Sequence, residues 1–312
     1  MASNPEHPRR IAVVGCGTVG ASFAALFLAY GLDVAATDPA PGAEDGLRRF
    51  VDRATTQLRD LGCRGEGRLS FHADLADALD GADFVQENAP EREDLKRRLL
   101  AEIDGLVPPQ VIVASSTSAL LRSRIIEDCA DKRRCIIAHP FNPPHLMPLV
   151  EIVGEDADVV ARAVNFFRAL DRKPVVLERE MVGHIANRLT SALFREAVYL
   201  AEQGVASVAD IDAAVSYGPG LRWAIMGPHM IYHLAGGEGG IAHYFAHLGP
   251  SHLQRWATLG NPTLSPEAQA RIVEGVVAQA AGRPVSELEA ERDRALIGLL
   301  RLLGRGPAGD SA

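Results

Sequence analysis

Three glycines at a fixed spacing, Gly15-x-Gly17-x-x-Gly20, constrain the fold of this chain more than any other feature. They follow a short apolar run at residues 11–15 and open an apolar, alanine-rich stretch at residues 18–30. In a dinucleotide-binding βαβ unit the first glycine allows the tight turn, the second lets a pyrophosphate approach the backbone, and the third lets helix and strand pack closely. The pyrophosphate then lies at the positive N-terminus of the helix. The spacing and its context predict a strand, a turn and a helix that bind a dinucleotide.

An acidic residue ends the next apolar run, residues 33–37, where a ribose-binding carboxylate is expected. Asp38 in that place accepts hydrogen bonds from the adenosine 2′- and 3′-hydroxyls and repels a 2′-phosphate, and no lysine or arginine follows it until Arg48. NAD is therefore favoured over NADP. The alternative is that Asp38 only caps the turn before Pro39. The residues expected to bind the cofactor here are Gly15, Gly17, Thr18, Val19, Gly20 and Asp38.

Strand and helix patterns alternate over more than 100 residues, which indicates a doubly wound sheet that the last two of the runs below extend. Besides residues 11–15 and 33–37, buried strands are expected at residues 83–86, 111–115, 135–138, 148–153 and 174–177, with helices that include residues 91–103 and 157–170. The predicted fold class is α/β, a Rossmann-type doubly wound sheet followed by an all-helical second domain.

The pattern changes at about residue 182, after which no strand pattern is found. One long helix is expected at residues 183–203, and Ser207 with Asp210 resembles a capping box that starts another. We expect three parts: an NAD-binding domain at residues 1–182, a helical substrate and dimerisation domain at residues 183–304, and a disordered tail at residues 305–312.

Composition narrows the possible partners. The chain of 312 residues is 47% hydrophobic and carries a net charge of −8, whereas nucleic acids and anionic membranes need a basic surface. The four cysteines show no CxxC spacing, as in a reducing compartment. The polar N-terminus leaves no room for a signal peptide, and no apolar run is long enough to span a membrane. A cytoplasmic protein is expected.

A histidine and a glutamate suggest the chemistry. His139 directly follows the strand-like run 135–138, at the sheet edge where open α/β sheets bind ligands, and Glu151 lies in the run 148–153. A histidine that takes a hydroxyl proton needs to be neutral, and a carboxylate on its other nitrogen holds the tautomer and stabilises the imidazolium that forms. From the residues alone, a capping histidine and a surface glutamate are an equally good interpretation.

The chain resembles the 3-hydroxyacyl-CoA dehydrogenase family from its first strand to its last helices. The segments that carry this resemblance are residues 15–20, Asp38, residues 82–91, 115–118 and 139–143, Glu151, and Gly183-x-x-x-Asn187-Arg188. The resemblance implies that His139 and Glu151 form the base and that Ser118 and Asn187 contact the reacting oxygen. It also implies a homodimer, and a nicotinamide end held by Glu91, Lys96, Ser118 and Asn142.

Residues 217–228 are similar to the branch of that family that holds L-gulonate 3-dehydrogenase, with the lambda-crystallins, and L-carnitine dehydrogenase. This branch acts on free hydroxy acids, and Arg222 either grips a carboxylate with two hydrogen bonds or packs on apolar surface. Residues 38–84 contain no lysine, which disfavours a coenzyme A arm. We therefore predict NAD-dependent oxidation of the 3-hydroxyl of a small 3-hydroxy acid. The alternatives are a dehydrogenase acting on the acyl-CoA thioester and an NAD-binding structural protein of the crystallin kind.

Histidine pairs and aromatic residues form two further patterns in the second half of the chain. The pairs His229/His233 and His243/His247 have helical spacing but lack the glutamate of an HExxH site, so no metal is expected. The aromatic residues Trp223, Tyr232 and Tyr244 either surround a trimethylammonium group or belong to the core.

Overall fold

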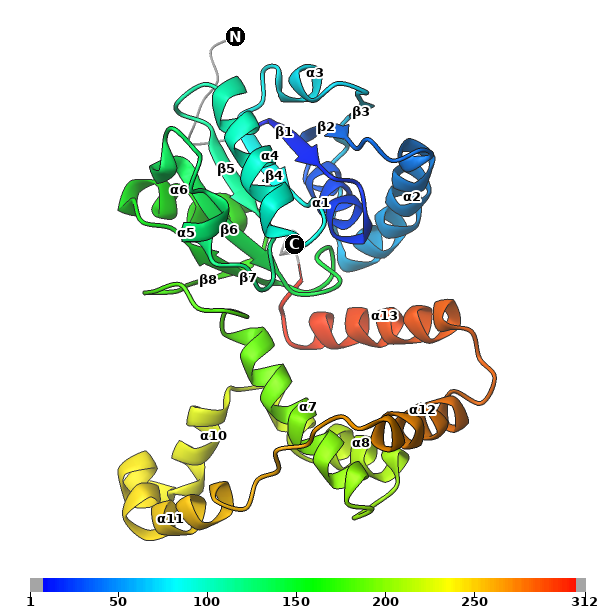
Figure 1. Ribbon diagram of the computed structural model, residues 1–312, viewed down its shortest axis with the longest axis vertical. Coiled ribbons are helices and arrows are strands. Elements are labelled where there is room, and N and C mark those ends of the chain that lie inside the picture. Colours follow the sequence, from blue (N-terminus) through cyan, green and yellow to red (C-terminus); the bar gives the residue numbers. More distant parts are fainter. Residues whose placement is uncertain (1–7, 307–312) are drawn as a thin grey trace. The chain divides into compact units, whose positions relative to one another are not determined.

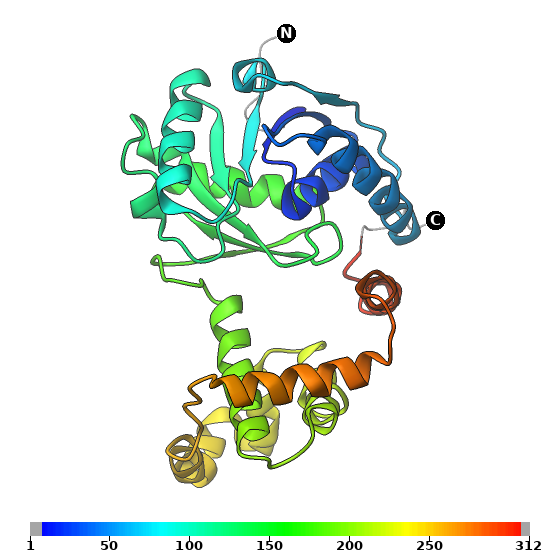
Figure 2. The same ribbon diagram turned by 45° about the vertical axis from the view of Figure 1, so that its right-hand side comes forward.

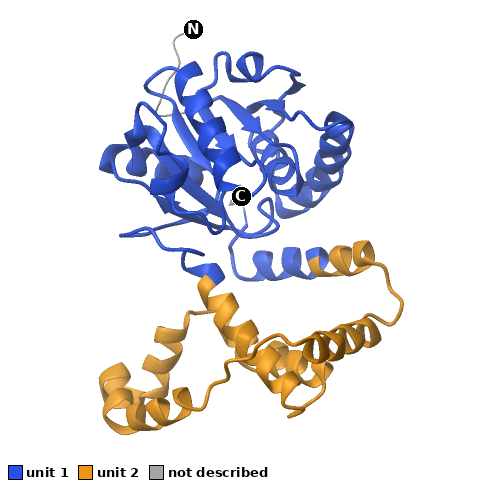
Figure 3. Ribbon diagram, viewed as in Figure 1, with its two compact units in different colours: residues 1–187, 293–312 blue, residues 188–292 orange. Residues whose placement is uncertain are grey.

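The computed structural model describes residues 8–306, which form two compact units. Of the described residues, the first contains 8–187 and 293–306 and the second contains 188–292 (Figure 3). The domain boundary expected between residues 182 and 183 falls inside the first unit. Of the tail expected to be disordered, residues 307–312 lie outside the described residues.

The first unit contains an eight-stranded sheet in the order β3-β2-β1-β4-β5-β6-β7-β8 (Figure 1). Neighbouring strands are parallel except β6 and β7, which pair antiparallel. The predicted α/β class with a doubly wound sheet is confirmed. The strands are β1 Arg10–Val14, β2 Asp33–Thr37, β3 Leu69–Phe71, β4 Phe84–Glu87, β5 Ile112–Ser115, β6 Cys135–Pro140, β7 Leu149–Val153 and β8 Lys173–Val176.

Helices cover both faces of the sheet, as the two ribbon views show (Figure 2). On one face α1 (Thr18–Ala29), α2 (Ala43–Leu61) and α6 (Ala157–Ala169) build an apolar core with Ile11 and Val13 of β1. On the other face α3 (Leu75–Leu79), α4 (Glu93–Leu106) and α5 (Arg122–Ile125) pack with Ala12 and Val14. Alternate residues of a strand point to opposite faces, so a strand covered on both sides is apolar throughout.

The last helix, α13 (Val285–Leu302), ends in the first unit. Ile297 and Leu300 pack against Leu61 and Leu146, and Asp293 accepts a hydrogen bond from Gln57. The sequence pattern assigned all of this helix to the second domain, because its amphipathic period does not identify the surface that its apolar face meets.

The second unit is entirely helical over its described residues. Ser207 accepts a hydrogen bond from the amide of Asp210 at 3.1 Å, as the capping box predicted. The glycines at 236–240 form a short 3-10 turn, η2 (Gly237–Gly239), between helices. The helices are α7 Ala186–Glu202, α8 Val208–Tyr217, α9 Pro219–Trp223, α10 Pro228–Ala235, α11 Gly240–Trp256 and α12 Pro266–Ala280.

Helix α7 begins at Ala186, three residues later than predicted. Gly183 and His184 have φ angles of 75° and 48°, in the left-handed region, which a right-handed helix cannot include. The helix therefore starts only after this turn. Across residues 8–306, no helix combines the length and apolarity that crossing a membrane requires.

Candidate active site

The glycine turn between β1 and α1 has the three features that a dinucleotide site needs. Gly15 has a φ of 90°, and a Cβ there would lie 2.7 Å from the carbonyl carbon of Asn88. A Cβ on Gly20 would lie 1.9 Å from the Gly15 oxygen, whereas a Cβ on Gly17 would meet no atom within 4 Å. The first and third glycines are therefore required by packing within the protein. The second leaves open space at the N-terminus of α1, where a pyrophosphate fits.

A cavity of about 790 Å³ adjoins this turn. Its lining includes Gly15, Gly17, Thr18, Val19 and Asp38, as expected for a cofactor site. The two carboxylate oxygens of Asp38 accept hydrogen bonds from the amides of Cys16, at 2.7 Å, and Ala40, at 2.8 Å. These bonds fix the carboxylate at the end of β2. The residues of the cavity thus fit a dinucleotide without a 2′-phosphate.

His139 and Glu151 form a buried pair on neighbouring strands. Because β6 and β7 run antiparallel, the two residues lie directly opposite each other in the ladder. His139 Nδ1 is 2.8 Å from Glu151 Oε2, and the residues are 5% and 1% exposed. A carboxylate can only accept, so Nδ1 carries the hydrogen and Nε2 of the neutral ring keeps a lone pair.

Two further donors hold the Glu151 carboxylate. The amides of Ile185 and Ala186, at the start of α7, donate to Oε1 at 2.8 and 3.0 Å. Burial by itself would raise the pKa of Glu151, but the hydrogen bonds from His139 and from these amides outweigh it, so the pKa lies below its ordinary value of 4.5. Glu151 is therefore ionised at neutral pH, which favours a proton on His139 during a reaction.

Glu91 fixes the loop that follows β5. Its Oε1 accepts hydrogen bonds from Thr117 Oγ1, from the amides of Ser118 and Ala119 and, at 3.2 Å, from Ser118 Oγ. Burial by itself would raise the pKa of Glu91. The hydrogen bonds from Thr117 and from the two amides, together with the charge of Lys96, outweigh burial, so the pKa lies below its ordinary value of 4.5. Asn187 joins the group because its Nδ2 donates to the backbone carbonyl oxygen of Ser118 at 3.3 Å.

Lys96 lies under this loop and is 1% exposed. Its Nζ is 2.8 Å from Glu87 Oε1 and 3.8 Å from Glu91 Oε2. Glu87, itself fully buried, also accepts a hydrogen bond from Ser115 Oγ at 2.5 Å. The Lys96 ammonium is thus engaged by carboxylates of the protein.

Two other predicted site residues lie on exposed segments. Asn142 is exposed in the loop after β6. Arg222 is exposed on α9 in the second unit. Among the described residues, no group of three or more histidine, cysteine or acidic side chains is arranged to hold a metal ion.

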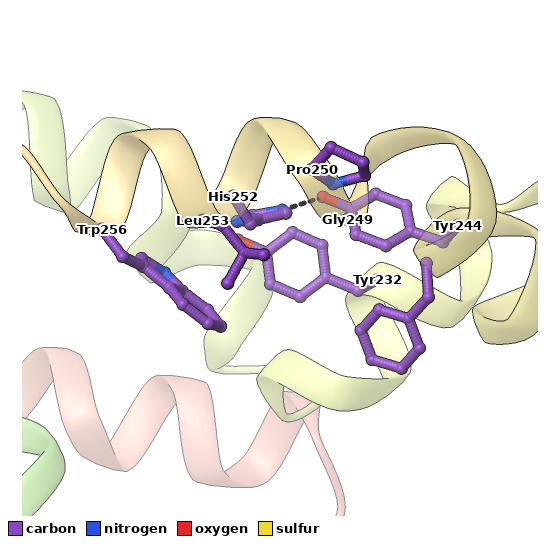
Figure 4. A pocket seen from close by; sticks show the side chains of 8 residues that line it. Tyr232, Tyr244, Gly249, Pro250, His252, Leu253 and Trp256 are labelled. Carbon is purple, nitrogen blue, oxygen red and sulfur yellow. Dashed lines mark hydrogen bonds between the residues drawn. The ribbon is translucent and has the colours of Figure 1, made fainter.

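The second unit carries an aromatic pocket of about 480 Å³ between α10 and α11. Figure 4 shows the ring of Tyr232 with Trp256 on one side and Tyr244 on the other, and the hydroxyl of Tyr244 bonded to His252. The rings of Tyr232 and Tyr244 lie 5.0 Å apart. Of the three aromatic residues singled out in the sequence, Tyr232 and Tyr244 line this pocket, and Trp256 lines it as well.

Sequence reasoning missed three residues of the first unit's cluster: Glu87, Thr117 and His184. Glu87 ends a predicted strand, and a charged residue at the carboxyl end of a buried strand was a usable signal. Thr117 and His184 carry no comparable signal, because their contacts depend on a loop and a turn that only the folded chain brings together.

A dinucleotide cradle and a buried imidazole–carboxylate pair within one α/β unit are features of NAD-linked dehydrogenases. The chain belongs to the 3-hydroxyacyl-CoA dehydrogenase family: residues 10–181 match the NAD binding domain of that family and residues 183–286 match its C-terminal domain. It is an NAD-dependent dehydrogenase by this membership.

Named relatives are similar over nearly their whole length. The L-carnitine dehydrogenase of Streptomyces coelicolor is 46% identical over 317 residues, covering 99% of each chain. That of Pseudomonas sp. is 41% identical, covering 97% of this chain and 96% of the relative. Among solved structures, an NAD⁺-dependent 5-formyl-3-hydroxy-2-methylpyridine 4-carboxylic acid 5-dehydrogenase superposes with a TM-score of 0.81 at 33% identity, covering 95% of this chain and 98% of that one.

Proposed function

We propose that this enzyme oxidises the 3-hydroxyl of a small free 3-hydroxy acid, L-carnitine or a close analogue, to the 3-keto acid. The observation that carries the proposal is the buried His139–Glu151 pair, in a chain whose named relatives at 41–46% identity are L-carnitine dehydrogenases. An ionised carboxylate on Nδ1 leaves Nε2 as the proton acceptor of the base.

In the proposed reaction the substrate hydroxyl gives its proton to Nε2 of His139 while the carbon–hydrogen bond breaks. NAD⁺, when bound, accepts the hydride. Glu151 stabilises the imidazolium as it forms, because its carboxylate is held by two backbone amides. Ser118 and Asn187 are the proposed donors to the substrate oxygen, and in the reverse direction they polarise the carbonyl.

The nicotinamide end of the cofactor is assigned to Glu91, Ser118 and Asn142. Lys96 has a different proposed role from the direct contact that the family resemblance implies. Because its ammonium lies buried against Glu87 and close to Glu91, we assign it to holding Glu91 in place.

The aromatic pocket of the second unit is the proposed site for a quaternary ammonium group. Tyr232, Tyr244 and Trp256 line the pocket, and none of its lining residues is acidic. A cation over such rings gains about 0.5–2 kcal/mol, depending on how far it is desolvated. Tetramethylammonium should quench tryptophan fluorescence in the wild type and not in Trp256→Leu. The neutral tert-butyl compound 3,3-dimethylbutanol, which lacks the cation, should have no effect, and equal quenching by both ligands would refute the assignment.

A substrate panel tests the function as a whole. NADH formation is followed with L-carnitine, L-gulonate and 3-hydroxybutyryl-CoA, and with D-carnitine as the stereochemical control. We expect the highest kcat/KM with L-carnitine. A preference for the thioester would instead establish an acyl-CoA dehydrogenase, and tight NADH binding without turnover of any 3-hydroxy acid would establish a structural NAD-binding protein.

We further propose a homodimer in the cytoplasm. Leu189, Leu193 and Phe194 on α7 are 60%, 38% and 58% exposed within the described chain, and their four-residue spacing places Leu189 and Leu193 on one side of the helix. All four cysteines are free and buried, as suits a reducing compartment. Light scattering coupled to size exclusion should give twice the chain mass of 33.4 kDa. A particle of 33.4 kDa at assay concentration would refute the dimer.

A further inference from the structure

His184 is a buried imidazole next to the base, and the mechanism above does not use it. It is 1% exposed, and its ring centre lies 5.0 Å from that of His139 at an interplanar angle of 47°. The family resemblance rests on Gly183, Asn187 and Arg188 and leaves position 184 unspecified. A polar ring in this place therefore needs its own explanation.

The backbone of His184 forms the turn that leads into α7. Its φ of 48° is one that few residues other than glycine adopt, although histidine, asparagine and aspartate do so more often than most. Its amide donates to the Met181 oxygen at 3.0 Å, which closes the turn. The next two amides, of Ile185 and Ala186, are the ones that donate to Glu151. The conformation of His184 thus determines where these two donors point.

The side chain of His184 is held from the opposite direction. Its Nε2 lies 3.0 Å from the Thr117 oxygen, and a carbonyl only accepts, so Nε2 carries the hydrogen. Thr117 directly precedes Ser118, a proposed contact of the substrate oxygen. The His184 ring therefore connects the loop after β5 with the ring of His139.

The charge state of His184 follows from its surroundings. Nδ1 is buried and has no hydrogen-bond partner among the described residues, so a second proton there would lack an acceptor. Burial lowers the pKa of His184 below its ordinary value of 6.5, and His139 lowers it further, while the bond to Thr117 and the charges of Glu151 and Glu91 act in the opposite direction. The ring is therefore neutral at neutral pH and does not compete electrostatically with an imidazolium on His139.

We propose that His184 is a positioning residue for the base: its turn directs two amides onto Glu151 and its ring packs against His139. This inference rests on the proposed function, since it assigns His139 the role of proton acceptor. Its structural part concerns the hydrogen bond between His139 and Glu151, which can be observed without turnover.

The test compares His184→Asn with His184→Ala in the full-length protein with NADH bound. Asparagine adopts the left-handed turn readily and has an amide that can donate to a carbonyl, whereas alanine does neither. The matched control is His72→Ala. It removes an imidazole that is hydrogen-bonded to Ser70 on β3, an edge strand of the sheet that is not a neighbour of β6 or β7. Each variant is assayed for the downfield proton resonance of the His139 Nδ1–H, for kcat and KM, and for NADH affinity.

We expect His184→Ala to lose or broaden the resonance and to lose about 10²-fold in kcat, the effect of a small misplacement of a catalytic group, with NADH affinity unchanged. His184→Asn and His72→Ala should retain the resonance and most of kcat. If the alanine variant fails to fold, His184→Gly takes its place: glycine keeps the turn but lacks the ring, so it should retain the resonance and lose kcat, and wild-type kcat in it would overturn the proposal. A retained resonance and kcat in His184→Ala, or an asparagine variant as impaired as the alanine one, would overturn the proposal.

The two claims can fail separately. If the wild type turns over no 3-hydroxy acid, the proposed function fails, and the resonance alone still decides whether His184 positions His139. If the wild type is active and His184→Ala is equally active, the function stands and the role of His184 is rejected.

Discussion

Replacing Glu151 by glutamine removes one negative charge from the buried pair and nearly preserves its shape. The side chain is 1% exposed, with Oε1 on the amides of Ile185 and Ala186 and Oε2 on His139 Nδ1. In the variant the amide oxygen can keep the two backbone donors. Its NH₂ group then faces His139 Nδ1, which favours the tautomer with hydrogen on Nε2, and that tautomer cannot accept the substrate proton.

The lost electrostatic stabilisation sets the size of the effect. A pair of unit charges about 4 Å apart, at an effective dielectric constant of about 20, attracts by about 4 kcal/mol. Because about 1.4 kcal/mol corresponds to a factor of ten in rate, Glu151→Gln should lower kcat by about 10³-fold. This value lies within the range of about 10²–10⁴ for the loss of a positioned acid–base group.

The assay is the initial rate of NADH formation at saturating NAD⁺, accompanied by NADH binding and circular dichroism. We expect the rate to fall while cofactor affinity and fold are retained. A rate within about threefold of wild type, less than 1 kcal/mol in barrier, would refute the argument that the carboxylate charge stabilises the imidazolium.

Three more predictions concern cofactor choice, substrate binding and pH. Asp38→Asn should raise the KM for NAD⁺ by about tenfold, the cost of a lost charge-assisted hydrogen bond, and should reduce the preference over NADP⁺; an unchanged preference would contradict the role of Asp38. We further propose that Arg222 binds the substrate carboxylate through two hydrogen bonds, one of the two roles that the sequence leaves open for it. Arg222→Ala should then raise KM for the hydroxy acid by about tenfold or more, and Arg222→Lys should restore little of it because lysine lacks the planar fork; full recovery in the lysine variant would argue against a two-point contact. The pKa of Glu151 lies below 4.5 in the folded chain, so the unfolded chain binds more protons at acid pH. The stability that this carboxylate contributes is therefore complete above about pH 4.5, and it is lost as the pH falls through the lower pKa of the folded chain. The difference in unfolding free energy between wild type and Glu151→Gln should therefore shrink in acid, and a constant difference from neutral pH to about pH 3 would contradict it.

The sequence predicted the local elements of the sheet well, because strands covered on both faces are recognisable as short apolar runs. The run at residues 33–37 coincides with β2, and the three glycines have the geometry that their spacing implied. What local patterns could not show is how distant elements pair. That β7 runs antiparallel to β6, and so places Glu151 opposite His139, is a property of the folded sheet.

The site was predictable only in part for the same reason. His139 and Glu151 were found by chemistry and resemblance, and the structure brings them within hydrogen-bond distance. The burial of the Lys96 ammonium against Glu87 depends on packing between β4 and α4, which local patterns do not show. The turn at His184 is set by two residues with positive φ, which an amphipathic pattern continuing across residues 183–203 concealed.

The central claim is that His139 accepts the proton of the substrate hydroxyl. The most direct test is a single-turnover experiment in which enzyme loaded with NAD⁺ is mixed rapidly with L-carnitine and NADH formation is recorded for wild type and His139→Ala. We predict one NADH per active site in the wild type and a rate at least about 10³-fold lower in the variant, with NAD⁺ binding unchanged. Hydride transfer in His139→Ala at a rate close to wild type would contradict the account.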